Sequence, residues 1–230
     1  MERFLPVRLT SFNTREIPVK ISRLILTGLL SVGCVGASHA SITASLWENT
    51  GSAMNATIAN KPGTAPDAQF NPTAINYNSN TTGYSIGAFF NNPVFYNTSA
   101  TFSPTNTMDN TYTLFTGSTY LNAGANSFVT PHDDGFELSI PTAFSDVGMT
   151  TAFDLSQPGP TSAVNTPYTV YAPTAGLYSF TLSYGEVLGA PAVLGFTVNG
   201  APVSNVPEPA SLALLGIGIA GLAALRRKAS

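Results

Sequence analysis

Residues 41–205 consist of short apolar or alternating runs that Gly, Pro, Asn and Asp separate from one another. No apolar period of 3.6 residues stands out, so the pattern argues against long helices. In residues 136–140 (FELSI) apolar and polar side chains alternate, as a half-buried strand requires. Asn199-Gly200 is a favourable hairpin turn because both residue types accept a positive φ. The pattern predicts an all-β fold, either a sandwich or a barrel of short strands.

The clearest strand candidates span residues 112–115, 126–129, 135–140, 168–171, 176–183 and 193–198. Residues 41–110 are less regular and rich in Asn, Thr, Ser and Pro, yet they carry nine aromatic side chains. A disordered segment would carry fewer, so we expect the first strands of the same sheets, joined by long loops. We expect these aromatic side chains to pack in the core rather than to form a platform for sugar stacking.

Residues 1–40 have the organisation of a secretory signal peptide. A basic segment precedes an apolar run over residues 24–35, and Ser38-His39-Ala40 supplies small residues before a cleavage site. This pattern predicts passage through the secretion translocon and cleavage by signal peptidase before Ser41. A retained signal anchor is the alternative, but the small residues argue against it. The single cysteine, Cys34, lies in this segment, so the exported part can form no disulfide and offers no thiol nucleophile.

The last 25 residues, 206–230, combine a proline-rich triplet, an apolar run and a basic end. The triplet and the basic end consist of Pro207, Glu208, Pro209 and of Arg226, Arg227, Lys228. The sixteen uncharged residues between them, 210–225, would form a helix of about 24 Å, slightly shorter than a hydrocarbon core of about 30 Å. The basic end would stay on the cytoplasmic side. These features predict a marginal transmembrane helix.

Together the triplet, the short glycine-containing apolar run and the basic end resemble the PEP-CTERM sorting signal. Proteins with this signal come from Gram-negative bacteria that make exopolysaccharide. The resemblance implies an exosortase, a membrane cysteine transpeptidase, that cuts near the triplet and releases or transfers the protein. It therefore implies transient anchoring in the inner membrane, followed by a place on the cell surface or in the extracellular biofilm matrix. An ordinary C-terminal anchor is the alternative.

The exported segment, residues 41–205, is strongly acidic. It carries one lysine, Lys61, against nine Asp and Glu residues, a formal charge of −8, whereas the whole chain has −3. Such a surface repels nucleic acid and anionic lipid, so no nucleic-acid partner is expected.

The same segment offers little to an enzyme. His132 is its only histidine, and no Gly-rich phosphate loop, metalloprotease helix or nucleophile elbow is present. Asp133 and Asp134 are adjacent and cannot form a glycosidase pair, which needs carboxyl groups about 5–10 Å apart. We expect no catalysis.

The sharpest candidate site is the sequence PHDDG, residues 131–135, which follows a strand candidate. Asp133 and Asp134 repel each other, and a cation between them makes it easier to keep both ionised. Oxygen ligands favour Ca²⁺, although a plain turn is the alternative. His132 lacks the second imidazole that a zinc site would normally need, and a lone histidine in a turn is expected to be exposed and inert.

Residues 116–200 resemble the central part of PA14-type domains, a β-sandwich or barrel fold. The segments that carry the resemblance are GSTYLNAG (117–124), Phe128-Val129, DDGFELSI (133–140), GLYSFTLSYGE (176–186) and AVLGFTV (192–198). In those PA14-type domains that are lectins, an Asp-Asp pair joined by a cis peptide binds Ca²⁺, an asparagine from a later loop completes the site, and the ion holds sugar hydroxyls. The resemblance implies that Asp133 and Asp134 are metal ligands, and the later position falls at or near Glu186, a departure from the lectin pattern.

Two functional hypotheses follow. The first is an exported surface or matrix protein whose domain, residues 41–205, binds exopolysaccharide or a surface glycan with the help of Ca²⁺. The alternative is a non-catalytic structural matrix protein whose domain is a Ca²⁺-rigidified scaffold. Free ligand positions beside Asp133 and Asp134 would favour the first hypothesis, and a closed coordination shell would favour the second.

Overall fold

The structure is a computed structural model that describes residues 42–205. The predicted signal peptide (1–40) and the predicted sorting helix (206–230) lie outside the described residues. Among residues 42–205, no helix has the length and apolar character needed to cross a membrane.

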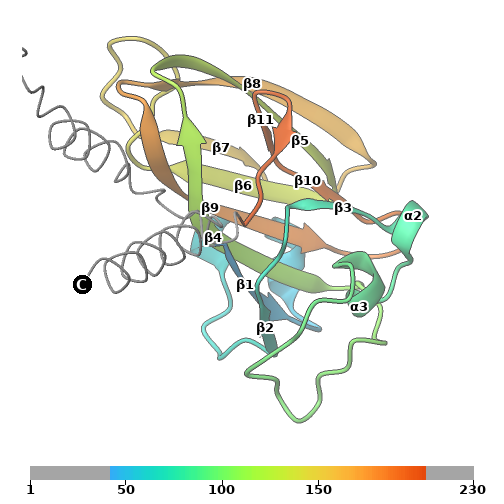
Figure 1. Ribbon diagram of the computed structural model, residues 1–230. Coiled ribbons are helices and arrows are strands. Elements are labelled where there is room, and N and C mark those ends of the chain that lie inside the picture. The colour runs from blue at the N-terminus through green and yellow to red at the C-terminus, as the bar shows by residue number, and fades with distance from the viewer. Residues whose placement is uncertain (1–41, 206–230) are drawn as a thin grey trace, which may run out of the picture. The chain divides into compact units, whose positions relative to one another are not determined.

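Two antiparallel sheets form the domain, and they lie in two layers (Figure 1). The first has the strand order β2 (Ala68–Phe70), β1 (Thr43–Trp47), β4 (Thr111–Leu121), β9 (Gly176–Glu186), β6 (Gly135–Ile140) and β7 (Phe153–Gln157). The second has the order β12 (Ala201–Pro202), β11 (Thr197–Val198), β5 (Gly124–Asp133), β10 (Val193–Gly195) and β3 (Asn76–Asn78), and β8 (Val164–Ala172) pairs with the other edge of β5. The predicted all-β sandwich is confirmed.

The strand candidates coincide with observed strands, with one difference. The candidate 193–198 is interrupted at Phe196, whose N–H donates to the carbonyl of Ile75 at 3.0 Å. The interruption leaves two short strands, β10 and β11, which pair with different parts of β5. The predicted hairpin is present between β11 and β12, and Asn199 and Gly200 have φ values of 51° and 84°.

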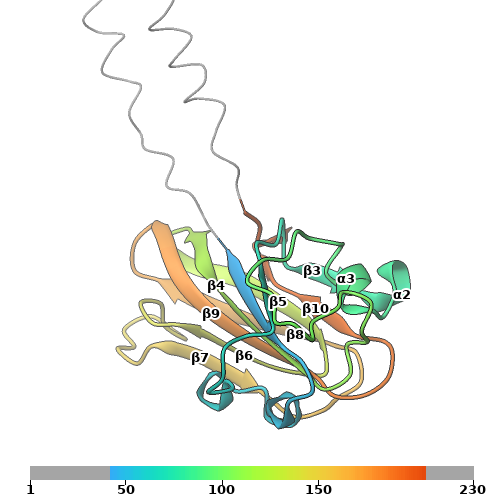
Figure 2. The ribbon, with the colours of Figure 1, turned by 90° about the horizontal axis from the view of Figure 1, so that it is seen from below.

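Residues 42–110 supply the first strands of the same two sheets, as expected. They also contain four helices of three to five residues: η2 (Gly51–Asn55), η3 (Ile58–Asn60), α2 (Ser79–Thr82) and α3 (Ile86–Phe89). Such short helices have no detectable period in the sequence. A polar side chain just before each helix accepts a hydrogen bond from a backbone N–H of its first turn. Figure 2 shows α2 and α3 beside β3.

Asparagine has a specific role in the loops. Among residues 42–205, the non-glycine residues with positive φ are all asparagines: Asn49, Asn91, Asn92, Asn97, Asn110 and Asn199. Asparagine tolerates the left-handed conformation better than most residues because its short side chain can form local hydrogen bonds. The high asparagine content therefore builds the tight turns between short strands.

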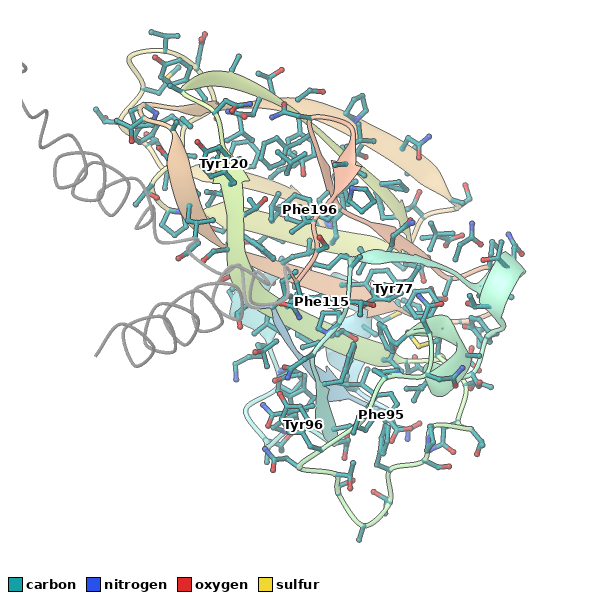
Figure 3. All side chains as sticks on the ribbon, viewed as in Figure 1. Tyr77, Phe95, Tyr96, Phe115, Tyr120 and Phe196 are labelled. Atoms are coloured by element: carbon teal, nitrogen blue, oxygen red, sulfur yellow. The ribbon has the colours of Figure 1, made fainter. Side chains whose placement is uncertain are left out.

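Most aromatic side chains of residues 42–110 pack in the core, as expected from the sequence, but Tyr96 is 36% exposed. Phe70, Tyr77, Phe90 and Phe115 are buried, and their ring centroids are 4.7–6.4 Å apart in contacting pairs. Figure 3 shows Tyr77, Phe115 and Phe196 between the two layers. Burial of these large apolar surfaces is the main source of stability in a domain that has no cysteine.

Candidate metal centre

The predicted Asp-Asp pair lies where the chain crosses from one sheet to the other. Asp133 is the last residue of β5 in the second sheet, and Gly135 is the first residue of β6 in the first sheet. The peptide bond between Asp133 and Asp134 is cis, as the PA14 resemblance implies. A Cβ atom at position 135 would collide with the carbonyl of Pro158, so only glycine allows this close approach.

Strand register brings the third predicted carboxylate to the same place. Glu186 is the last residue of β9, and its neighbour Gly185 pairs with Gly135 of β6. One carboxylate oxygen from each of Asp133, Asp134 and Glu186 lies within 4.8 Å of the others. The structure therefore brings all three predicted metal ligands together, in a group that we call the acidic triad.

The acidic triad is buried. Asp133 and Asp134 are each 7% exposed, and Glu186 is 1% exposed. Lys61, the only lysine or arginine among residues 42–205, instead lies over the ring of Trp47 at 5.4 Å. No basic side chain of the described part of the chain therefore neutralises the triad.

Hydrogen bonds orient the carboxylates without filling all their acceptor positions. The two oxygens of Asp134 accept from the N–H groups of Thr161 at 3.0 Å and of Val187 at 2.8 Å. The two oxygens of Glu186 lie 2.8 Å from the hydroxyl of Tyr184 and 3.2 Å from that of Tyr84. Since each carboxylate oxygen carries two lone pairs, every one of these oxygens can still bind a cation.

Burial shifts the protonation of two of the three carboxyl groups. It raises the pKa of Glu186 to about 8, and the nearby charges of Asp134 and Asp133 add to the effect. Burial and the charge of Asp134 raise the pKa of Asp133 to about 6. Without a cation, the site therefore retains protons near neutral pH, and a bound cation would displace them.

The donor set fits a hard cation. Three carboxylates offer up to six oxygen ligands, and Ca²⁺ takes six to eight at 2.3–2.6 Å. Asp133, Asp134 and Glu186 would hold the ion, and carbonyl groups, water or a bound ligand would complete its shell. The charge of the ion would offset the repulsion among the three carboxylates.

The expectation that His132 is exposed and inert is wrong. His132 belongs to β5 rather than to a turn, and it is 1% exposed. Its Nδ1 lies 2.6 Å from the carbonyl oxygen of Asp134, so Nδ1 carries the donated proton. Its Nε2 lies 3.0 Å from the hydroxyl of Thr166 and 3.2 Å from Oε1 of Gln157. With both nitrogens engaged, His132 positions the Asp134 backbone and is not a metal ligand.

Some residues that shape the site were not predicted from the sequence. Tyr184 precedes Glu186 by two positions in a strand, so the two share one face, and this spacing could have revealed it. Tyr84 and Thr161 come from loops far away in the sequence, and no local pattern marks them.

Comparisons with known proteins cover both the terminal segment and the domain. A family model described as the PEP-CTERM protein-sorting motif matches residues 205–228. The sequence has no match among curated proteins. Among solved structures, the chain is similar to the PA14 domain of the MpAFP antifreeze protein, with 16% identity and a TM-score of 0.52, over 71% of this chain and 86% of that one.

Two further structures show a weaker likeness. A PA14 sugar-binding domain from an RTX adhesin has 12% identity and a TM-score of 0.47, over 74% of this chain and all of that one. The epithelial adhesin 9 A domain from Candida glabrata, in complex with Galb1-3GlcNAc, has 9% identity and a TM-score of 0.39, over 74% of this chain and 90% of that one. The likeness to the MpAFP domain concerns the fold alone, and it agrees with the observed two-layer architecture. This chain thus combines a β domain of the PA14 fold with a PEP-CTERM protein-sorting motif.

Proposed function

We propose that this protein is sorted to the cell surface or the extracellular matrix and there binds carbohydrate through Ca²⁺. The PEP-CTERM motif implies an exported, surface-targeted protein. Under this proposal the translocon and signal peptidase act on residues 1–40, and an exosortase of a Gram-negative host cuts near Pro207-Glu208-Pro209.

The observation that carries the binding proposal is the buried acidic triad, which no lysine or arginine among residues 42–205 neutralises. Burial of several carboxylates is unfavourable unless a cation or hydrogen bonds compensate for the lost hydration. Ca²⁺ held by Asp133, Asp134 and Glu186 would supply that compensation. Two hydroxyl groups of a sugar could then take the coordination positions that the protein leaves open.

A specific observation also favours the alternative, a Ca²⁺-rigidified scaffold. The triad is only 1–7% exposed, which leaves little room for a ligand to approach the ion. The ion would then join the crossing from β5 to β6 with the end of β9 and stabilise the domain without binding anything outside it. We further propose that the domain is not an enzyme, because both nitrogens of its single histidine serve structural hydrogen bonds.

Thermal unfolding tests the metal site first. Protein exported from cells that express the full chain would be unfolded in excess EDTA and in millimolar Ca²⁺. A ligand at 100 times its Kd adds about 2.7 kcal/mol, which corresponds to several degrees for a domain of this size. We expect this increase in Tm for the wild type and not for the double variant Asp133→Asn/Asp134→Asn.

The matched control is Asp146→Asn/Asp154→Asn, which removes the same charge from two exposed positions and should keep the Ca²⁺ response. If Ca²⁺ leaves the Tm of the wild type unchanged, the proposed metal site is wrong. A glycan array in Ca²⁺ and in EDTA then separates the two functions. Retention of glycans only in Ca²⁺ supports a lectin, and a Ca²⁺-dependent Tm without retention supports the scaffold.

A further inference from the structure

A residue from outside the acidic triad contacts Glu186. Tyr84 lies between α2 and α3, about a hundred positions before Glu186, and its hydroxyl is 3.2 Å from Oε1 of Glu186. The same hydroxyl is 2.7 Å from Oδ1 of Asp109. Tyr84 therefore links the third metal ligand to a second carboxylate that does not belong to the triad.

The single hydroxyl proton of Tyr84 cannot serve both carboxylates fully. The shorter distance indicates that the hydroxyl donates to Asp109, so its contact with Glu186 is the weaker one. Asp109 thus holds the Tyr84 hydroxyl beside Oε1 of Glu186, where it limits the positions that this carboxylate can take.

Asp109 also fixes the backbone that follows Glu186. Its Oδ1 accepts from the N–H of Gly189 at 3.0 Å, and the N–H of Asn110 donates to the carbonyl of Val187 at 2.9 Å. On the other side, the N–H of Val187 donates to Asp134 at 2.8 Å. Residues 187–189 are therefore held between the metal-site aspartate and the 109–110 segment.

Asp109 is itself held in place. The hydroxyl of Thr107 donates to its Oδ2 at 2.7 Å, and three hydrogen bonds in total converge on this carboxylate. Such convergence favours the ionised form, so Asp109 is a fixed negative charge that acts through a tyrosine on a metal ligand.

We propose that Tyr84 and Asp109 are positioning residues for the metal site, and that they set its cation affinity through Glu186 and the 187–189 backbone. This inference rests on the proposed Ca²⁺ binding. Groups that orient metal ligands typically change metal affinity by 10–100-fold when they are removed. Tyr84→Phe and Asp109→Asn should each weaken Ca²⁺ binding by about tenfold or more. Because Tyr84 and Asp109 share the contact with Glu186, the two losses should overlap, and the double variant should bind Ca²⁺ less weakly than the product of the two single effects predicts.

Calorimetric titration of the exported protein with Ca²⁺ measures these affinities. The control variant is Tyr120→Phe, which removes an exposed hydroxyl from β4 (Figure 3). Thr111, at one end of β4, pairs with Glu186, whereas Tyr120 lies near the opposite end of the strand. The affinity of this variant should equal that of the wild type. Tb³⁺ in place of Ca²⁺ gives a second readout, because its luminescence lifetimes in H₂O and D₂O count the waters on the ion. A displaced Glu186 should admit about one additional water in Tyr84→Phe and Asp109→Asn, a change that a loss of fold stability alone would not produce.

The outcomes are distinguishable. If the wild type does not bind Ca²⁺, the proposed metal site fails and the positioning role fails with it. If the wild type binds Ca²⁺ while both single variants bind within twofold of it with unchanged lifetimes, only the positioning role is overturned. Should Tyr84→Phe fail to fold in EDTA, Asp109→Asn decides the question by the same two measurements.

Discussion

Two buried regions of the sandwich differ in chemistry and in their effect on stability. The aromatic region around Phe70, Tyr77, Phe90 and Phe115 consists of contacting rings between the sheets. The acidic triad, at the ends of β5 and β9, is equally hidden from water, but it buries carboxyl groups. Burial is favourable in the first region because it removes apolar surface from water, and unfavourable in the second because it removes charge from water.

Tyr184 joins the two regions. Its ring stacks on Phe89 with centroids 6.0 Å apart, while its hydroxyl contacts both the carbonyl oxygen of Asp133 and the carboxyl group of Glu186. The aromatic region supplies the packed frame, and this frame holds the carboxyl groups together although their charges repel one another. Stability and metal binding should therefore respond to different substitutions.

The largest expected effect lies in the aromatic region. Phe115→Ala removes a fully buried ring that contacts three other aromatic side chains, and it should lower the free energy of unfolding by about 3–5 kcal/mol. Denaturant titration would measure this loss. We expect the same loss in EDTA and in saturating Ca²⁺. A Ca²⁺ contribution to stability that disappears in Phe115→Ala would show that the two regions are not separable.

The acidic triad should make stability depend on pH in a direction opposite to that of a typical ion-paired carboxylate. In the metal-free fold the pKa values of Glu186 and Asp133 are about 8 and about 6, above their ordinary values of 4.5 and 3.8. For each group, the folded state therefore holds more protons than the unfolded state at pH values between its ordinary pKa and its raised pKa. The contribution of these two groups to the free energy of unfolding is fully present below about pH 4, and it is lost as the pH rises toward 8.

Thermal unfolding in EDTA at several values between pH 5 and 8 measures this effect, and the Tm contribution of the triad should fall across the series. The increase in Tm caused by Ca²⁺ should grow over the same range, since the ion binds the ionised carboxylates. Glu186→Gln should reduce the slope in EDTA and weaken the Ca²⁺ response. A Ca²⁺ response that is constant from pH 5 to 8 would contradict the raised pKa values.

The smallest effect concerns Lys61, which lies outside both regions. Lys61→Met keeps most of the side-chain length but removes the cation over the Trp47 ring, so it should lower the free energy of unfolding by about 0.5–1 kcal/mol. Chemical denaturation followed by Trp47 fluorescence would measure it. The Ca²⁺ affinity should stay unchanged, and a clear change would mean that Lys61 contributes to the potential at the triad.

Much of the architecture could be predicted from local sequence patterns. The strand candidate 135–140, in which residues 136–140 alternate, has the observed bounds of β6, and Asn199-Gly200 predicted the hairpin between β11 and β12. These predictions succeeded because side-chain period and turn chemistry act over a few residues. The short helices around residues 51–60 and 79–89 escaped prediction because they depend on packing and on single capping side chains.

The residues of the candidate site also differ in how well their roles could be predicted from the sequence. Asp133 and Asp134 were candidates from the sequence because two adjacent carboxylates repel each other, and the resemblance to PA14-type domains supported them against a plain turn. The role of His132 was mispredicted because its partners, Thr166 and Gln157, come from other strands. Exposure of a side chain depends on those distant neighbours and not on its own flanking residues.

By itself, the sequence determined the terminal PEP-CTERM motif and the all-β character, and it marked Asp133 and Asp134 as candidates, while Glu186 was implied by the resemblance to PA14-type domains. Only the tertiary structure decided that these carboxylates are buried within 4.8 Å of one another, and that the Tyr84 hydroxyl contacts both Glu186 and Asp109. The physical reason is that motifs and alternation are local properties of the chain. Burial, pKa and ligand geometry instead arise where strands that are distant in sequence pair in register and two sheets close over one another.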